Sequence, residues 1–306
     1  MDNILSPIVL FVYNRFEHTV KTLQSLQKNE LANQSELFIY SDAPKDETAF
    51  GEVYRVREYI KTIDGFKKVT IIQRDKNWGL ANSIIDGVTK IINQYGKIIV
   101  LEDDLVTSPY FLKFMNEALE YYENSQDIWH ISGWNYPIQT TNTENVFCWR
   151  LMNCWGWATW AKKWNHYEKN VSKLISEFNN EDIHKFNLDG VENFWNQVLQ
   201  NKNNKINTWA IFWYATIFKK GGLCINPSQT FVENIGHDGS GVHCAKNDSF
   251  SSQLSVKGNI KYQPQSKENL IVVDKIKHFY KINKRSLLTR ILNKVSRKII
   301  GKNLIK

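Results

Sequence analysis

The feature that most constrains the fold is a strand–helix alternation repeated four times in the first 123 residues. The expected strands are 7–12, 36–40, 68–72 and 97–101, and the expected helices are 17–28, 48–62, 81–94 and 110–123. Continuous apolar runs such as Ile8–Val12 are typical of strands that are buried on both faces of a parallel sheet. The alternation therefore predicts an α/β fold with an open, mostly parallel, twisted sheet, right-handed crossovers and flanking helices.

Polar side chains follow each of these four strands, at the point where the strand ends. They are Asn14 and Arg15, Ser41 and Asp42, Arg74 and Asp75, and the acidic run Glu102-Asp103-Asp104. Ligands of open parallel sheets bind at the carboxyl ends of the strands. The pattern therefore predicts a nucleotide-type site at this edge of the sheet.

The acidic run Glu102–Asp104 is the strongest chemical signal. Neighbouring carboxylates raise one another's pKa, because like charges lie close together. A hard divalent cation such as Mg²⁺ or Mn²⁺ neutralises such a cluster and keeps coordination positions for diphosphate oxygens. We therefore expect a metal here that acts as a Lewis acid on a leaving diphosphate. The alternative is a solvated acidic turn before the helix that begins near Ser108-Pro109.

Three further candidates follow the second and third expected strands, and two of them have a structural alternative. Asp42 can accept a hydrogen bond from a base-ring N–H, or it forms a turn before Pro44. Arg74 can bind a diphosphate in a bidentate manner, or it is a surface arginine. The segment 77–82 contains a glycine that lets the backbone approach a ligand closely. The donor-site candidates in that segment are Asn77, Gly79 and Asn82.

Between 110 and 245 the pattern is mixed. A strand is expected at 129–132, an aromatic stretch occupies 154–160, helices are expected near 191–200 and 209–219, and a loop-rich segment runs from 221 to 243. The part from 234 to 243 has three glycines in six residues, which is typical of a loop that closes over a donor. His243 in this loop is a candidate metal or phosphate ligand, and the alternative is a structural histidine.

The net charge of +8 belongs to the C-terminal tail. Residues 275–306 contain 11 Lys and Arg and no Asp or Glu, which leaves 28 basic and 31 acidic residues elsewhere. A slightly acidic body argues against a nucleic-acid-binding domain. Apolar residues recur in the tail at helical spacing between cations, which suits a helix lying on an anionic membrane surface. The alternatives are a helix packed on the domain and a solvated tail. The apolar positions are Leu287, Leu288, Ile291, Leu292, Val295, Ile299 and Ile300.

The chain has no run near the roughly 18 apolar residues that a membrane span needs, and no secretory signal pattern. Its cysteines, Cys148, Cys154, Cys224 and Cys244, lack the C-x-x-C spacing of zinc sites. We therefore expect free thiols in a reducing compartment. The expected location is the cytoplasm, with peripheral association to the inner face of the cell membrane.

Several motifs, taken in order, resemble a known group of enzymes. They are Val100–Leu105 with 108–111, then 131–135, then Trp155-Gly156-Trp157 and Trp160. Together they resemble the N-acetylglucosaminyltransferase I family and, more closely, bacterial family-2-like transferases that build capsule, lipopolysaccharide and other surface glycans. The bacterial proteins also have counterparts of 77–80 and of the 234–244 loop, so the resemblance covers roughly residues 6–245.

The resemblance implies a GT-A (Rossmann-like) fold, a UDP-sugar donor, and Mn²⁺ or Mg²⁺. It implies that Asp42 contacts the uracil and that Asp104 binds the metal, while Glu102 and Asp103 support the ribose and the metal shell. The turn Tyr13-Asn14-Arg15 would line the nucleotide pocket. The expected divisions are 1–108, the nucleotide-sugar-binding half; 109–250, the acceptor-binding half; and 251–306, a C-terminal extension with a basic amphipathic helix.

The sequence departs from this pattern at one position. In the N-acetylglucosaminyltransferase I family an Asp after a Trp at a helix start is the base, and the counterpart here is Trp209-Ala210. An inverting displacement needs a base near the attacking oxygen. The candidate substitutes are Glu233, Asp238 and Glu192.

The expected activity is metal-dependent transfer of a sugar from a UDP-sugar to a glycan acceptor, with a lipid-linked glycan as one option, in surface polysaccharide synthesis. Two other functions stay open. One is a sugar-phosphate nucleotidyltransferase, although the turn at 12–16 lacks the glycines of its phosphate loop. The other is a non-catalytic glycan-binding or nucleotide-sugar-binding protein.

Overall fold

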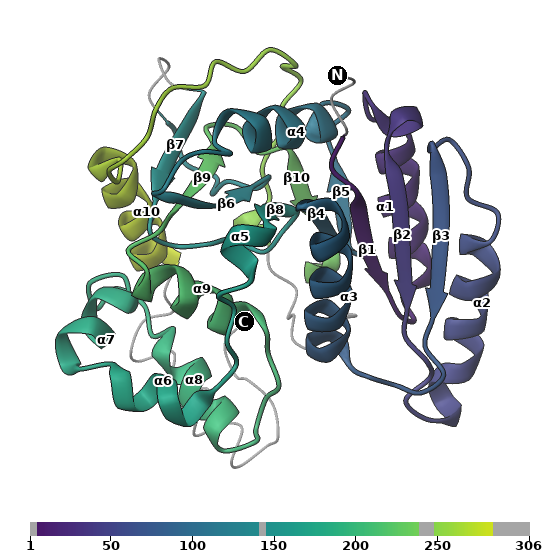
Figure 1. The fold of residues 1–306 in the computed structure, drawn as a ribbon, viewed down its shortest axis with the longest axis horizontal. Helices are drawn as coiled ribbons and strands as arrows, with labels where there is room; N and C mark the ends of the chain where they lie inside the picture. Colours follow the sequence, from purple (N-terminus) through teal and green to yellow (C-terminus); the bar gives the residue numbers. More distant parts are fainter. Residues whose placement is uncertain (1–4, 141–144, 239–247, 284–306) are drawn as a thin grey trace.

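The computed structural model describes residues 5–140, 145–238 and 248–283, and Figure 1 shows how they are arranged. An eight-stranded sheet forms the centre, in the order β3-β2-β1-β4-β8-β6-β9-β7. Its strands are β1 (Ile8–Val12), β2 (Glu36–Ser41), β3 (Lys68–Gln73), β4 (Lys97–Glu102), β6 (Ile128–Ser132), β7 (Val146–Trp149), β8 (Trp157–Trp160) and β9 (Leu223–Pro227). A separate antiparallel pair consists of β5 (Leu105–Thr107) and β10 (Val232–Asn234).

The N-terminal half of the sheet forms as predicted. Strands β1 to β4 are parallel, and each begins and ends within one residue of its predicted position. Helices α1 (Phe16–Gln27), α2 (Phe50–Ile60) and α3 (Leu80–Tyr95) connect them. All five residues of β1 are buried, because helices cover both faces of this part of the sheet. The expected open, mostly parallel α/β sheet is confirmed.

The order of the strands creates a reversal between β1 and β4. The chain passes outward from β1 through β2 to β3 and then returns to β4, on the other side of β1. Right-handed crossovers place α1 and α2 on one face of the sheet and α3 on the opposite face. The crevice at the carboxyl ends of β1 and β4 is therefore the topological switch point, where open sheets bind their ligands.

The second half of the sheet is mixed. Strand β8 is antiparallel to β4 and β6, β9 is parallel to β6, and β7 is antiparallel to β9. Three expected helices are present as α4 (Phe111–Tyr121), α8 (Trp195–Lys202) and α9 (Ala210–Lys219), although α8 begins later than predicted. The short helices α5 (Ala161–Trp164), α6 (Val171–Glu177) and α7 (Asn180–Phe186) were not predicted.

The expectation of a loop-rich segment from 221 to 243 is wrong for its first part. Strand β9 is fully buried between β6 and β7, and β10 pairs with β5. Asn226 lies inside β9, where its amide accepts from Trp149 Nε1 at 3.0 Å and donates to the Trp134 carbonyl at 2.9 Å. Both partners are distant in sequence. In the sequence alone the polar Asn226 therefore suggests a loop, but in the structure its hydrogen bonds are satisfied inside a buried strand.

Helix α10 (Leu270–Asn283) packs on the body, beside β7 in Figure 1. Val272, Val273, Ile276 and Phe279 are buried. Lys275 Nζ donates to the Gln139 carbonyl at 2.7 Å, and Lys277 Nζ lies 2.7 Å from an Asp189 carboxylate oxygen. The first two cations of the predicted membrane tail thus bind the protein itself. The apolar stripe from Leu287 onward lies outside the described residues.

The cysteines and the helices bear on two smaller expectations. Cys148, Cys154 and Cys224 are free thiols, as expected, and Cys148 and Cys224 are buried; Cys244 lies outside these ranges. None of the helices described has both the length and the apolar character needed to cross a membrane.

Candidate active site

Three strand ends meet at the switch point, and each carries candidate residues. Arg15 comes after β1, Asp42 directly follows β2, and Glu102 is the last residue of β4. The acidic run then turns into β5, which pairs with β10. The structure therefore collects the turns at 13–15, 42–43 and 102–104 at one edge of the sheet, as the sequence predicts.

The turn after β1 contacts the acidic run directly. Arg15 Nη1 lies 2.7 Å from Asp104 Oδ2, and the Tyr13 N–H donates to Asp103 Oδ2 at 3.3 Å. On α1, the Thr22 hydroxyl donates to the Asp103 carbonyl at 2.9 Å. The acidic run is thus attached to β1 and α1 and is not the solvated turn of the alternative interpretation.

The surroundings of the acidic run disfavour the charged form of two of its carboxyl groups. Burial raises the pKa of Glu102 to about 8, with repulsion from Asp104 and Asp103 adding to the effect. Burial and repulsion from Asp104 also raise the pKa of Asp103, to about 7. A bound cation would stabilise both carboxylates in their charged form.

The donor set of this run fits a hard divalent cation, because it consists of carboxylate oxygens. Within residues 5–140, 145–238 and 248–283, no group of three or more His, Cys, Asp or Glu side chains is arranged to hold a metal ion. Carboxylates of the run would bind such an ion, and diphosphate and water oxygens would complete the coordination. The other predicted ligand, His243, lies outside the described residues.

A short segment at 236–238 closes over Asp104. The Ile235 N–H donates to the Asp104 carbonyl at 2.9 Å, and a Cβ on Gly236 would lie 2.1 Å from Asp104 Oδ2. Asp238 lies 3.6 Å from Arg15 Nη2 and 3.1 Å from His18 Nε2. The beginning of the predicted loop is therefore part of the site.

Asp42 organises the turn before α3. Its carboxylate accepts the backbone N–H groups of Ala43 at 3.0 Å, Trp78 at 2.8 Å and Gly79 at 2.8 Å. Gly79 has a φ of +70°, a conformation that favours glycine. Asp42 thus connects the end of β2 with the turn before α3, on the predicted nucleotide side of the site. Its contact with a base stays a prediction.

The asparagines of this turn also make local hydrogen bonds. Asn77 Nδ2 donates to the Ala43 carbonyl at 2.7 Å, and Asn82 Nδ2 donates to the Trp78 carbonyl at 2.9 Å. Asn14, which separates Tyr13 from Arg15, is half-buried in the turn after β1. Their contacts with a donor remain predictions.

Arg74 is buried, so the alternative of a surface arginine is wrong. Only 8% of the residue is exposed, and its guanidinium forms an ion pair with Asp86 on α3. The guanidinium also lies 4.0 Å from the centre of the Trp78 ring and 5.0 Å from that of Tyr40. These contacts fix the third strand end against α3. A contact between Arg74 and a diphosphate stays a prediction.

Two residues of the site were missed by the sequence reasoning. His18 lies three positions after Arg15 in the first turn of α1, which faces the predicted site, and this spacing could have indicated it. Asp86 had no such signal, because its pairing with Arg74 depends on how α3 packs on the sheet.

The candidate bases lie in different places. Asp238 is next to Arg15, whereas Glu233 on β10 accepts from the Ser251 hydroxyl at 3.1 Å. Glu192 is close enough to Tyr280 to contribute to the rise of the Tyr280 pKa, which burial dominates. Ala210 is the first residue of α9, as predicted, and its methyl group cannot take a proton.

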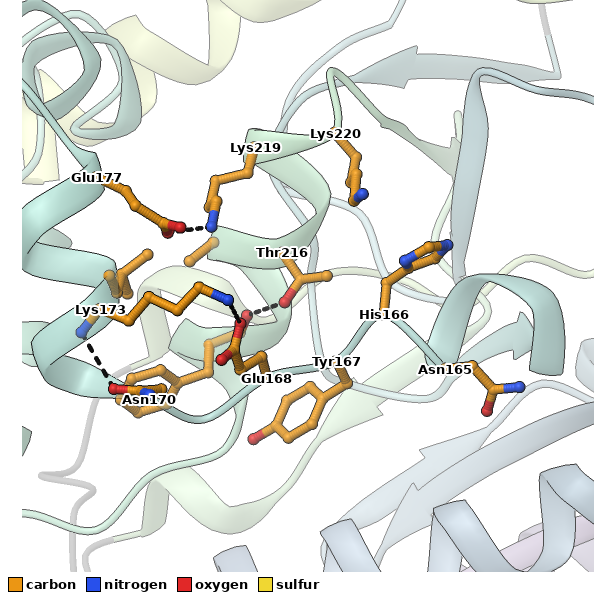
Figure 2. A pocket seen from close by; sticks show the side chains of 13 residues that line it. Asn165, His166, Tyr167, Glu168, Asn170, Lys173, Glu177, Thr216, Lys219 and Lys220 are labelled. Atoms are coloured by element: carbon orange, nitrogen blue, oxygen red, sulfur yellow. Dashed lines mark hydrogen bonds and ion pairs between the residues drawn. The ribbon is translucent and has the colours of Figure 1, made fainter.

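The second half of the chain contains several cavities, including the following two. One, of about 330 Å³, is lined mainly by aromatic and aliphatic side chains, including Trp155 and Ala210. The other, of about 540 Å³, lies between 165–177 and 212–220 and is shown in Figure 2. In that groove Lys173 pairs with Glu168 at 2.7 Å and Lys219 pairs with Glu177. Its lining contains none of the predicted site residues.

Comparisons with solved structures show distant likenesses. S. aureus TarS 1-349 is 10% identical with a TM-score of 0.38, covering 74% of this chain and 59% of that one. A mannosyltransferase from Pyrobaculum calidifontis, in complex with GDP-Man and Mn²⁺, is 9% identical with a TM-score of 0.37, covering 70% of each chain. The galactosyltransferase LgtC, with donor and acceptor sugar analogs, is 10% identical with a TM-score of 0.36, covering 69% of this chain and 70% of that one.

Coverage of the TarS structures is partial, since this chain spans 24% of one and 59% of the other. Among curated proteins, no sequence matches this chain. The family model described as glycosyl transferase family 2, however, matches residues 8–192, more than half of the 306 residues. With the strand order and the acidic run at the switch point, this match establishes that the chain belongs to glycosyl transferase family 2 and is a glycosyltransferase with the GT-A fold.

Proposed function

We propose that this glycosyltransferase moves a hexose or N-acetylhexosamine from a UDP-sugar to a glycan acceptor in the synthesis of a bacterial surface polysaccharide. The observation that carries the proposal is the meeting of Arg15, Asp42 and the acidic run at the switch point. This edge offers both a cationic group and carboxylates to a nucleoside diphosphate. The acceptor glycan would enter from the half of the chain formed by 109–250.

The acidic run would hold Mn²⁺ or Mg²⁺ through Asp104, with Glu102 and Asp103 supporting the ribose and the metal shell. Such a cation, when bound, supplies Lewis-acid stabilisation of the leaving diphosphate. Tyr13, Asn14 and Arg15 would line the nucleotide pocket. Asp42, Arg74, Asn77, Gly79 and Asn82 would shape its base and phosphate side, and His243 would add a ligand from the loop.

For inversion, a carboxylate must take the proton of the acceptor hydroxyl. Asp238 is the first candidate, because its carboxylate lies 3.6 Å from the arginine that pairs with Asp104. Glu233 is the second. We expect Asp238→Asn or Glu233→Gln to abolish transfer while UDP binding survives. Full activity in both variants would remove these candidates.

The peripheral membrane role belongs to the same proposal. The segment 284–306 contains eight Lys and Arg and no acidic residue, so it would attract an anionic lipid surface. This placement, on the inner face of the cell membrane, suits an enzyme whose acceptor is a lipid-linked glycan.

The decisive experiment is a panel of UDP-sugars screened for metal-dependent thermal stabilisation and for UDP release. A ligand that binds the native state raises its apparent stability. We expect one UDP-sugar to stabilise the protein with Mn²⁺, and Asp104→Asn to remove the metal-dependent part. Glu58→Gln, at an exposed ion pair on α2, is the matched control. Normal transfer by Asp104→Asn would overturn the metal assignment, and binding without UDP release would favour the non-catalytic alternative.

A further inference from the structure

The cavity of about 330 Å³ lies directly beside the acidic run. Trp155 lines it, and its ring centre is 5.2 Å from that of His237, the residue after Gly236. Cys154 also lines it; burial raises the pKa of this thiol strongly, and the Glu102 and Asp104 carboxylates raise it further. A molecule in this cavity would therefore lie next to the carboxylates at the end of β4.

The lining of the cavity is uncharged. Its residues in the described ranges are Trp134, Tyr136, Leu151, Met152, Asn153, Cys154, Trp155, Phe194, Gln197, Ala210, Ile211, Tyr214, Phe250 and Tyr280. Charged groups of both signs lie beyond the lining: Glu192 contributes to the raised pKa of Tyr136 and Tyr280, and Arg150 acts in the opposite direction on the pKa of Tyr214, while burial is the main cause for all three. Among the residues that the structure describes, the lining contains no Lys, Arg or His, so a ligand carboxylate or phosphate here would lose hydration without a cationic side chain in the wall to pair with, at a large free-energy cost.

The cavity nevertheless offers a few polar groups. Asn153 Nδ2 is buried and has no hydrogen-bond partner, while Asn153 Oδ1 accepts from the Tyr136 hydroxyl at 3.2 Å. The Tyr136 and Tyr280 hydroxyls are 2.8 Å apart. A buried donor without an acceptor is unfavourable, so a ligand oxygen at Asn153 Nδ2 would be stabilising. Aromatic walls with a small number of polar groups are typical of small-molecule pockets.

We propose that this cavity binds the acceptor as an uncharged sugar, whose apolar C–H face packs on the aromatic walls and whose hydroxyl oxygen accepts from Asn153 Nδ2. Its volume is near the lower end of the range for small-molecule pockets, about 300–1,000 Å³, so it holds a short sugar segment. Tyr280 on α10 and Phe250 lie outside the region 8–192 that matches the family model. The inference rests on the proposed transferase activity.

The first test measures binding without any donor. The probes are the methyl glycosides of glucose, galactose, N-acetylglucosamine and glucuronic acid, observed by saturation-transfer NMR on the full chain. We expect a signal from at least one neutral glycoside and none from the glucuronide. Gln197→Lys, which places a cation at an exposed position of the lining, should admit the glucuronide. A wild-type glucuronide signal equal to the neutral ones, or no neutral signal, would overturn the proposal.

The second test uses transfer kinetics with the acceptor that is active. Tyr280→Phe keeps the ring and removes one hydroxyl, so the KM for the acceptor should rise about two- to tenfold, and more than the KM for the donor. Tyr54→Phe, at an exposed tyrosine on α2, is the matched control and should change neither constant. If Tyr280→Phe also changes neither, the cavity is not the acceptor site.

The two proposals fail in different ways. If no UDP-sugar yields UDP with any acceptor, the proposed function is wrong, whatever the NMR shows. If UDP-sugar is turned over while the Tyr280 and Gln197 variants behave like the wild type, only the acceptor site is wrong.

Discussion

Substitution of Gly236 by alanine tests whether the segment at 236–238 positions the acidic run. The added Cβ would lie 2.1 Å from Asp104 Oδ2 and 2.9 Å from Arg15 Nη1. Ordinary contact needs about 3.4 Å, so one group must move by about 1.3 Å. A displacement of about 1 Å at a reacting centre can reduce the rate about 10²-fold.

We therefore expect Gly236→Ala to lower kcat/KM for sugar transfer about 100-fold. The φ of Gly236 is not in the left-handed region, so alanine adds no backbone strain, and the cost is limited to local overpacking of about 1–3 kcal/mol. The assay is UDP release at saturating acceptor, together with the unfolding free energy from denaturant titration.

The control is Gly51→Ala, because a Cβ at this helical position would have no atom within 4 Å. It should keep full activity and gain up to about 1 kcal/mol of stability from the higher helix propensity of alanine. A Gly236→Ala protein with the kcat/KM of the wild type would refute the positioning role of this segment.

Three further predictions concern other parts of the molecule. Burial lowers the pKa of His130 to about 3, whereas a histidine in the unfolded chain has a pKa of about 6.5. Below about pH 6.5 the unfolded chain therefore binds a proton that the folded protein does not, and the free energy of unfolding should fall by about 2 kcal/mol between pH 7 and pH 5. Denaturant titrations at pH 7 and pH 5 should show this decrease in unfolding free energy for the wild type but not for His130→Gln. The same pH dependence in both proteins would contradict the prediction. Asp42→Asn replaces an acceptor oxygen by an NH₂ group where three N–H groups converge; it should cost about 1–3 kcal/mol of unfolding free energy and weaken UDP binding in calorimetry, and an unchanged affinity would exclude Asp42 from the pocket. A chain that ends at Asn283 keeps all of α10 and should lose co-sedimentation with anionic vesicles, whereas unchanged co-sedimentation would exclude the tail as the lipid-binding segment.

The position of that truncation depends on the structure. The sequence alone suggests a tail that begins at residue 275, where the cations begin. A cut there would remove the buried Ile276 and Phe279 and the ion pair between Lys277 and Asp189. It would damage the body as well as remove the tail, so loss of lipid binding could not be assigned to the tail.

The N-terminal half could be predicted from the sequence because its signals are local. Each parallel strand is a compact run bounded by polar residues, and β1 to β4 lie within one residue of their predicted positions. The acidic run begins at the last residue of β4, so its place at the edge of the sheet follows from the parallel topology.

The rest depends on contacts between distant segments. The burial of β9 requires Trp149 and Trp134 to satisfy Asn226, and neither partner is visible from the sequence around 226. The approach of Gly236 to Asp104 joins segments separated by more than 100 residues. Likewise, Tyr280 reaches the aromatic cavity only because α10 folds back on the body.

Helix α10 also bears on the order in which the enzyme is completed during synthesis. Translation proceeds from the N-terminus, and the sheet edge with the acidic run is finished long before the ribosome reaches Leu270. Tyr280, in one wall of the aromatic cavity, is synthesised only after that edge. A nascent chain that has not reached α10 therefore has the acidic run in place while the neighbouring cavity lacks its Tyr280 wall.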